Sequence, residues 1–158
     1  MPLAVLARVT ADILAEGADA AARRGDGFAH KWGLLYTWHD ADYLGAAHGL
    51  AGILQTILHV EAAGVALNES DAGRVRAGTM ALAESLLPSG NMTTRYEAKR
   101  GSDDRLVQWC HGAPGFLLLA AASAAHKGPC GIPAARLARP AAAAAECVWC
   151  VHCMNASR

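Results

Sequence analysis

The sequence lacks an excess of charge of either sign. Lysine and arginine together number 14, and aspartate and glutamate together also number 14, so the formal net charge is zero. Proteins that bind nucleic acid usually carry a basic surface, because lysine and arginine neutralise the phosphate backbone. The even balance therefore disfavours a nucleic-acid partner.

Long uncharged apolar runs are missing as well. Although 53% of the 158 residues are hydrophobic, histidine, glycine or charge interrupts every run before the length of about 18 residues that a membrane-spanning helix needs. The apolar residues 1–6 have neither the basic leader nor the long apolar centre of a signal peptide. We therefore expect a cytoplasmic protein with no transmembrane segment.

The chain lacks an even number of cysteines, since it has five. An odd number without a secretion signal argues against a disulfide framework and favours a reducing compartment. Cys147, Cys150 and Cys153, with His152 between the last two, could form a small metal-binding module. Structural zinc sites normally use two separated ligand pairs, so a helix tail with chance cysteines is the interpretation we prefer.

Strand patterns of useful length do not occur either, and apolar residues repeat at helical spacing along most of the chain. The sequence therefore predicts an all-α protein. We expect helices over residues 3–23, 44–62, from 68 or 70 to 87, 113–126, and from 134 or 140 to the end, with an aromatic loop over 28–42 and an exposed polar loop over 91–105.

One short pattern, His-Gly-x-x-Gly followed by an apolar run, occurs twice. The copies begin at His48 and His111, 63 positions apart. A repeat of this length has room for two helices and their turns, which favours stacked helical hairpins. The glycine after each histidine permits an unusual backbone angle or a close approach, and Pro114 suits a first helical position. Each histidine should lie at the mouth of a buried helix, either as a functional group or as a structural residue of the turn.

Two segments together resemble the lanthionine synthetase C-like (LanC-like) proteins of animals, which are relatives of the bacterial lanthionine cyclases. They are residues 43–52, YLGAAHGLAG, and residues 106–115, LVQWCHGAPG. The resemblance covers most of the chain, from about Leu6 to Cys150. It implies an α/α toroid of seven helical hairpins with a central zinc, held by two cysteines and one histidine, whose fourth position is open to a thiol substrate.

The resemblance also implies roles for four residues. Cys110 matches the first zinc ligand of the family, and His48 matches its active-site histidine, a candidate acid or base. His111 falls where bacterial cyclases often carry a tyrosine near the metal, which implies a role in protonation. Arg105 lies near the position of a functional arginine in some cyclases, which implies contact with a bound cofactor or substrate.

The chemistry implied is thioether formation. Zinc lowers the pKa of a bound thiol, so that a thiolate attacks the β-carbon of a dehydroalanine or dehydrobutyrine residue. A histidine near the metal then supplies the proton that the resulting enolate needs. In bacterial relatives the thiol is a cysteine of the same peptide. For animal members the resemblance implies glutathione, added to dehydroamino acids in proteins.

The chain departs from the family pattern at both ends. The remaining two zinc ligands belong to a Cys-His-Gly motif, whereas here the match stops at Cys150 and residues 151–158 form an unrelated tail in which His152 precedes Cys153. A catalytic zinc ordinarily takes about three protein ligands. We therefore expect residues 1–150 to be a partial toroid, with 151–158 as a divergent tail. Such a fragment, alternative product or incomplete gene model would be inactive alone and would expose apolar faces.

Two classes of function follow from this interpretation. In the first, the intact protein is a zinc-dependent enzyme that adds a thiol, glutathione or a peptide cysteine, to dehydroamino acids, and this chain carries part of its site. The alternative is a non-catalytic glutathione-binding or interaction protein at the periphery of the plasma membrane, a location that the resemblance to animal members implies.

Overall fold

The computed structural model of the chain describes residues 2–96 and 104–156, with side chains up to residue 150. These residues form six helices and no strand, which confirms the all-α prediction; two isolated bridges join Trp38 to Ala41 and Tyr43 to Arg95. Within the same ranges, none of the helices is both long and apolar enough to cross a bilayer. The helices are α1 (Leu3–Arg23), α2 (Asp26–Trp32), α3 (Leu50–Ala62), α4 (Glu69–Glu84), α5 (Ala113–Ala125) and α6 (Ala134–Ala156).

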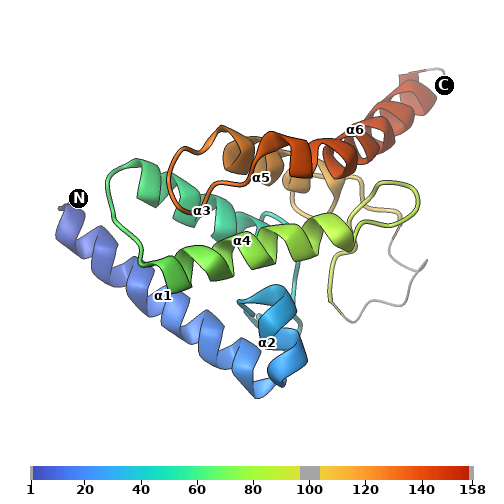
Figure 1. The fold of residues 1–158 in the computed structure, drawn as a ribbon. Coiled ribbons are helices and arrows are strands. Elements are labelled where there is room, and N and C mark those ends of the chain that lie inside the picture. Colours follow the sequence, from blue (N-terminus) through green and yellow to red (C-terminus); the bar gives the residue numbers. More distant parts are fainter. Residues whose placement is uncertain (1, 97–103, 157–158) are drawn as a thin grey trace.

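The helices pack around one apolar core. Helix α5 contacts α3 and α6, while α4 contacts α2, α3 and α6. Figure 1 shows α1 and α2 on one side of the molecule and α6 on the other, with α3, α4 and α5 between them. The core includes Leu54 of α3, Leu82 of α4 and Phe116 of α5, none of which is exposed to solvent. The apolar runs that follow the two His-Gly-x-x-Gly patterns therefore meet at the centre of the fold.

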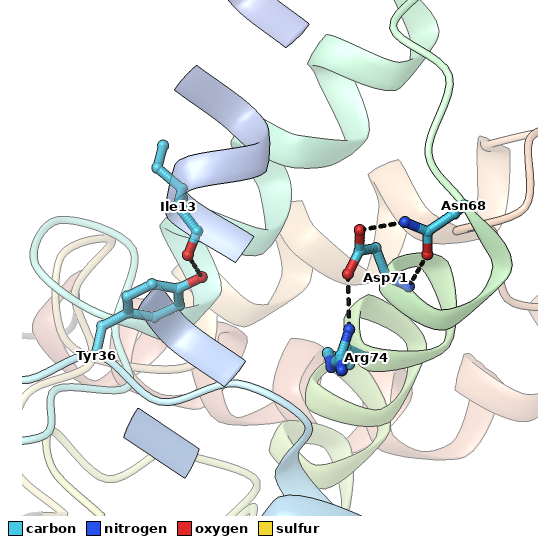
Figure 2. Close-up of polar contacts among 5 residues, drawn as sticks. All are labelled: Ile13, Tyr36, Asn68, Asp71 and Arg74. Carbon is cyan, nitrogen blue, oxygen red and sulfur yellow. Dashed lines mark hydrogen bonds and ion pairs between the residues drawn. The ribbon is translucent and has the colours of Figure 1, made fainter. Parts of the chain in front are cut away.

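Helix α4 follows the earlier of its two predicted starts, residue 68. Asn68 occupies the N-cap position, and its Oδ1 accepts a hydrogen bond from the backbone N–H of Asp71 at 2.9 Å. Figure 2 shows the Asp71 carboxylate bound in turn by Asn68 Nδ2 and by Arg74, one turn along the helix. An asparagine at this position satisfies an N–H group that has no partner within the helix.

Two predicted boundaries, the start of the loop at residue 28 and the start of the helix at about residue 44, were wrong. The expected loop over 28–42 begins with a helix, α2, because Gly25 adopts a φ of 111° that turns the chain directly out of α1. Burial of Trp32, on which Phe28 stacks at 5.9 Å between ring centroids, stabilises this short helix. Helix α3 begins at Leu50 instead of about Leu44, because residues 44–49 form a turn.

The expected exposed loop over 91–105 was wrong at its start. Asn91, Met92 and Thr94 are buried, and the backbone carbonyl of Thr94 accepts a hydrogen bond from the N–H of Leu44 at 2.9 Å. Hydrogen bonding of this kind makes burial of a polar segment affordable. Residues 97–103 of the predicted loop lie outside the described residues, and Asp104 and Arg105 are exposed.

Helices α5 and α6 agree more closely with the sequence. Helix α5 ends at Ala125, one residue before the predicted end, and Pro114 lies in its first turn. Of the two starts left open for the last helix, the structure has the earlier one, at Ala134, so Pro140 lies inside α6. That helix continues to Ala156 and therefore crosses the predicted domain boundary at residue 150.

Candidate functional site

The two repeated patterns form turns that touch each other. The first turn, residues 44–49, leads into α3, and the second, residues 108–112, leads into α5. A Cβ atom at Gly45 would overlap the backbone carbonyl oxygen of Cys110 and would lie 3.1 Å from the Cα of His111. Because such an approach is open only to a residue without a side chain, glycine at position 45 lets the two turns meet.

Three aromatic rings gather where the turns meet. The ring centroids of His48 and His111 are 6.2 Å apart, and the ring of Tyr43 lies 6.3 Å from His48 and 6.0 Å from His111. His48 is exposed, whereas Tyr43 and His111 are half-buried. Two imidazoles and a phenol within this distance can donate, accept and pass protons around a small ligand. We call these three residues the ring cluster.

Tyr43 belongs to a segment held at several points. The neighbouring Asp42 is buried, and its carboxylate binds the guanidinium of Arg24 and the hydroxyl of Thr37. Its backbone carbonyl accepts a hydrogen bond from the N–H of Tyr96 at 2.9 Å. The backbone carbonyl of Tyr43 itself accepts a hydrogen bond from the N–H of Leu50, the first residue of α3. Tyr43 therefore presents its ring from a fixed backbone.

Cys110 lies in the second turn, next to His111. Its thiol is half-buried and free, and its Sγ donates a hydrogen bond to Oε1 of the exposed Gln108 at 3.5 Å. Arg105 is exposed in the turn that follows the part of the chain that is not described. The structure thus brings His48, His111 and the turn of Cys110 together, and it shows no contact between the described side chain of Arg105 and the ring cluster.

Two residues near this site were not predicted as functional. Tyr43 completes the ring cluster, and in the sequence it appears only as the first residue of the segment 43–52 that resembles the family, with no role implied for it. Asn91 is fully buried, and its Oδ1 accepts a hydrogen bond from the N–H of Ala113, the first residue of α5, at 2.9 Å. A buried asparagine that pairs with a residue 22 positions away leaves no local signal in the sequence.

A cavity of about 490 Å³ opens beside His48, between α1, α3 and residues 36–38. This volume is in the range of small-molecule sites. Tyr36 forms part of the wall, where its hydroxyl donates to the carbonyl of Ile13 at 3.0 Å (Figure 2). Burial, and to a lesser degree the negative charge of Glu16, raises the pKa of Tyr36. The phenol therefore stays protonated as a donor at neutral pH.

The described side chains do not complete a zinc site. Among them, no three histidine, cysteine, aspartate or glutamate residues lie close enough together to hold a metal ion. Near the end of α6, Cys147 is buried, and burial, followed by the charge of Asp104, raises its thiol pKa. Cys150 is exposed. The other candidates of the predicted metal-binding module, His152 and Cys153, have side chains outside the described set.

Comparison with known proteins gave a family match and two informative relatives. A model of the family described as "Lanthionine synthetase C-like protein" matches residues 7–150. The protein named LanC-like protein GCL1, from Arabidopsis thaliana, is 37% identical over 120 residues, which are 75% of this chain and 24% of that protein. The protein named Glutathione S-transferase LANCL1, from Danio rerio, is 34% identical over 86 residues, which are 54% and 20% of the respective chains. The chain spans about a quarter of the length of the curated relatives it matches.

Proposed function

The chain belongs to the lanthionine synthetase C-like family, and from this premise we propose that its ring cluster and Cys110 form part of a site that binds a thiol of the glutathione class. In the intact protein, this site would add the thiol to dehydroamino-acid residues of peptides or proteins. The observation that carries the proposal is the meeting of His48 and His111, 6.2 Å apart, next to Cys110. The name of the zebrafish relative, a glutathione S-transferase, supports the choice of thiol.

The chemistry requires the movement of one proton. Addition of a thiol to dehydroalanine forms a bond from sulfur to the β-carbon, breaks the S–H bond and places a proton on the α-carbon. One imidazole of the pair takes the thiol proton as a base, and the other donates a proton to the enolate carbon as an acid. Histidine suits both steps because its unperturbed pKa lies near neutrality, at about 6.5. His48, which is exposed, exchanges protons with solvent and resets the pair.

Zinc enters this proposal only through the family. If the intact protein binds zinc, Cys110 is the residue of this chain that would supply a thiolate ligand, and the metal would lower the pKa of the bound thiol. The described side chains lack the remaining ligands, so the residues present do not fit a complete site and we assign no step to the metal. We also propose that residues 151–158, which lie beyond the family match, form a tail outside the shared sequence.

A second candidate is a protein that binds glutathione without reacting it, located at the periphery of the plasma membrane. The incomplete set of metal ligands among the described residues favours this candidate. The two candidates share the ring cluster and differ in whether a thioether product forms.

Calorimetric titration with glutathione tests the proposed site. We expect the chain to bind glutathione and the variants Cys110→Ala and His48→Ala to bind it at least about tenfold more weakly. His126→Ala is not a suitable control, because that imidazole pairs with Glu61 at 2.6 Å. His59→Ala, near the C-terminal end of α3, removes a histidine outside the ring cluster and should leave binding unchanged.

Mass spectrometry of a dehydroalanine peptide incubated with glutathione tests whether this chain forms a thioether product, which would support the enzyme. We expect this chain to add glutathione no faster than buffer does, because it offers one matching zinc ligand where catalytic sites ordinarily take about three. Zinc content near one per chain that is lost in Cys110→Ala would support the enzyme. Binding without zinc or product is the result expected of this chain alone under either candidate, and failure to bind glutathione would overturn both.

A further inference from the structure

Asn91 connects the turn after α4 to the start of α5. Its backbone carbonyl accepts a hydrogen bond from the N–H of Leu87 at 2.8 Å, and its N–H donates to Oγ of Ser89 at 3.2 Å, so the residue is fixed to the turn after α4. Its side-chain Oδ1 accepts from the N–H of Ala113 at 2.9 Å. Asn91 therefore caps α5 from a position 22 residues earlier in the chain.

The site has no local substitute for this cap. The N-cap residue of α5 is Gly112, which has no side chain to accept a hydrogen bond from the helix. A Cβ atom at Gly112 would lie 2.9 Å from Oδ1 of Asn91, so the amide occupies the space directly beside the turn. Asn91 and Gly112 are thus fitted to each other, immediately after Cys110 and His111.

The hydrogen bonding around Asn91 is unusual for a residue that only stabilises the fold. Three buried side-chain polar atoms lack a hydrogen-bond partner in the part of the chain that is described: Asn91 Nδ2, His111 Nδ1 and Ser123 Oγ. Two of the three belong to Asn91 and to His111, a residue of the turn that leads into the helix that Asn91 caps. Unpaired buried polar groups are uncommon and are often found at functional sites.

We propose that Asn91 is a positioning residue for the candidate site. Asn91 lies after α4 and binds the first N–H of α5. It thereby holds the turn that carries Cys110 and His111 in position next to the turn of His48. The proposal rests on the proposed function for its meaning in catalysis or binding, but its structural consequence is measurable without any activity. Without Oδ1, the ring of His111 loses its fixed distance from Tyr43 and His48.

The chain offers a matched control in Asn68. Its Oδ1 caps α4 by accepting from the N–H of Asp71 at the same distance, 2.9 Å (Figure 2), far from Cys110 in the sequence and outside the ring cluster. Both Asn91→Ala and Asn68→Ala remove one cap, and a loss of this kind lowers the melting temperature of a chain of this size by about 2–4 °C. Only Asn91→Ala should alter the ring cluster.

Proton NMR of the aromatic rings gives the readout. We expect NOE cross-peaks from His111 to Tyr43 and to His48 in the wild type and in Asn68→Ala, and their loss in Asn91→Ala, while the cross-peak between Tyr43 and His48 persists. Asn91→Asp keeps an oxygen at the position of Oδ1 and should restore all three cross-peaks. Glutathione binding should be weakened about tenfold in Asn91→Ala and restored in Asn91→Asp.

Two results would overturn the proposal. One is a ring cluster in Asn91→Ala with the same cross-peaks as in Asn68→Ala. The other needs no variant: if the backbone amide of Ala113 in the wild type exchanges with solvent as fast as an unbonded amide, Asn91 does not hold it. If the wild type shows the ring cross-peaks but does not bind glutathione, the result would count against the proposed function alone.

Discussion

Gly45 illustrates how a single residue brings two distant motifs together. The position has no side chain, and any Cβ there would overlap the carbonyl oxygen of Cys110. The contact joins residues 65 positions apart in the sequence. Because backbone cannot shift as a flexible side chain can, the meeting of the two turns depends on this glycine.

Substitution of Gly45 by alanine should therefore lower the free energy of unfolding by at least about 1–3 kcal/mol, the range typical of strain and overpacking. Gly27 is the control, since it lies in helix α2 and a Cβ atom there would meet nothing within 4 Å. Gly27→Ala should raise the free energy of unfolding by about 0.4–1 kcal/mol. Urea denaturation measures both, and equal effects of the two substitutions would show that Gly45 is not a contact point.

Cys130 gives a prediction about pH. It is fully buried, and burial, together with a hydrogen bond to Glu61 and the charge of that carboxylate, raises its thiol pKa. A raised pKa in the folded state means that the stability is complete below the unfolded thiol pKa of about 8.5 and is lost as the pH rises above it. The free energy of unfolding should fall above about pH 8.5 by up to about 1.4 kcal/mol per pH unit from this group.

The variant Cys130→Ala lacks the titrating thiol and should show a shallower decline over the same alkaline range. Chemical denaturation at a series of pH values measures the two slopes. Cys147, whose thiol pKa is also raised by burial, remains in both proteins and contributes equally. Identical slopes for the wild type and the variant would contradict the assignment to Cys130.

The site residues were predictable to different degrees. His48 and His111 each begin a copy of the His-Gly-x-x-Gly pattern that precedes an apolar run, and Cys110 adjoins the second copy. The sequence alone therefore singles out these three residues. Tyr43 lies before the first pattern and carries no repeat signal. Asn91 lies in a polar segment that was predicted to be exposed, and its burial depends on hydrogen bonds to the first residue of α5 and to the turn after α4, which no local pattern records.

At the scale of helices, boundaries set by an apolar stripe and a capping residue were predictable. The bounds of α1 and α5, to within one residue, and the N-cap of α4 at Asn68 agree with the sequence pattern. The short helix α2 was missed because its seven residues are too few for a period to be visible. The start of α3 was placed too early because Leu44 and Ala46 are apolar and buried although they lie in the turn before the helix, so the apolar pattern of α3 extends over them in the sequence.

Helix α5 offers a test of which face supports the site. Leu119 is fully buried, whereas the adjacent Leu118 is 47% exposed. Leu119→Ala should lower the free energy of unfolding by about 2–5 kcal/mol, the cost of a cavity in a packed core. Leu118→Ala should change it by no more than about 0.5 kcal/mol, as expected of a surface position. Thermal or urea denaturation compares them, and similar losses would mean that α5 packs through a different face.

At the scale of the whole molecule, helical hairpins and family membership were predictable because the two repeats are specific in combination. The arrangement of the helices around one core confirms the all-α fold. The metal ligands could not be settled in the same way, since one ligand position is matched by Cys110 and the described residues supply no full set. Trp109 and Trp149 are among the exposed large apolar side chains, and the association expected of a partial ring stays a prediction.

The central claim is that the turns of His48 and His111 form one thiol-binding site. NMR titration of the chain with glutathione tests it most directly, with S-methylglutathione as the control that lacks the S–H group. We predict that resonances of His48, His111 and Tyr43 shift together along one saturation curve with glutathione, and that S-methylglutathione binds at least about tenfold more weakly. Shifts confined to one histidine, or no shifts at saturating glutathione, would contradict the claim.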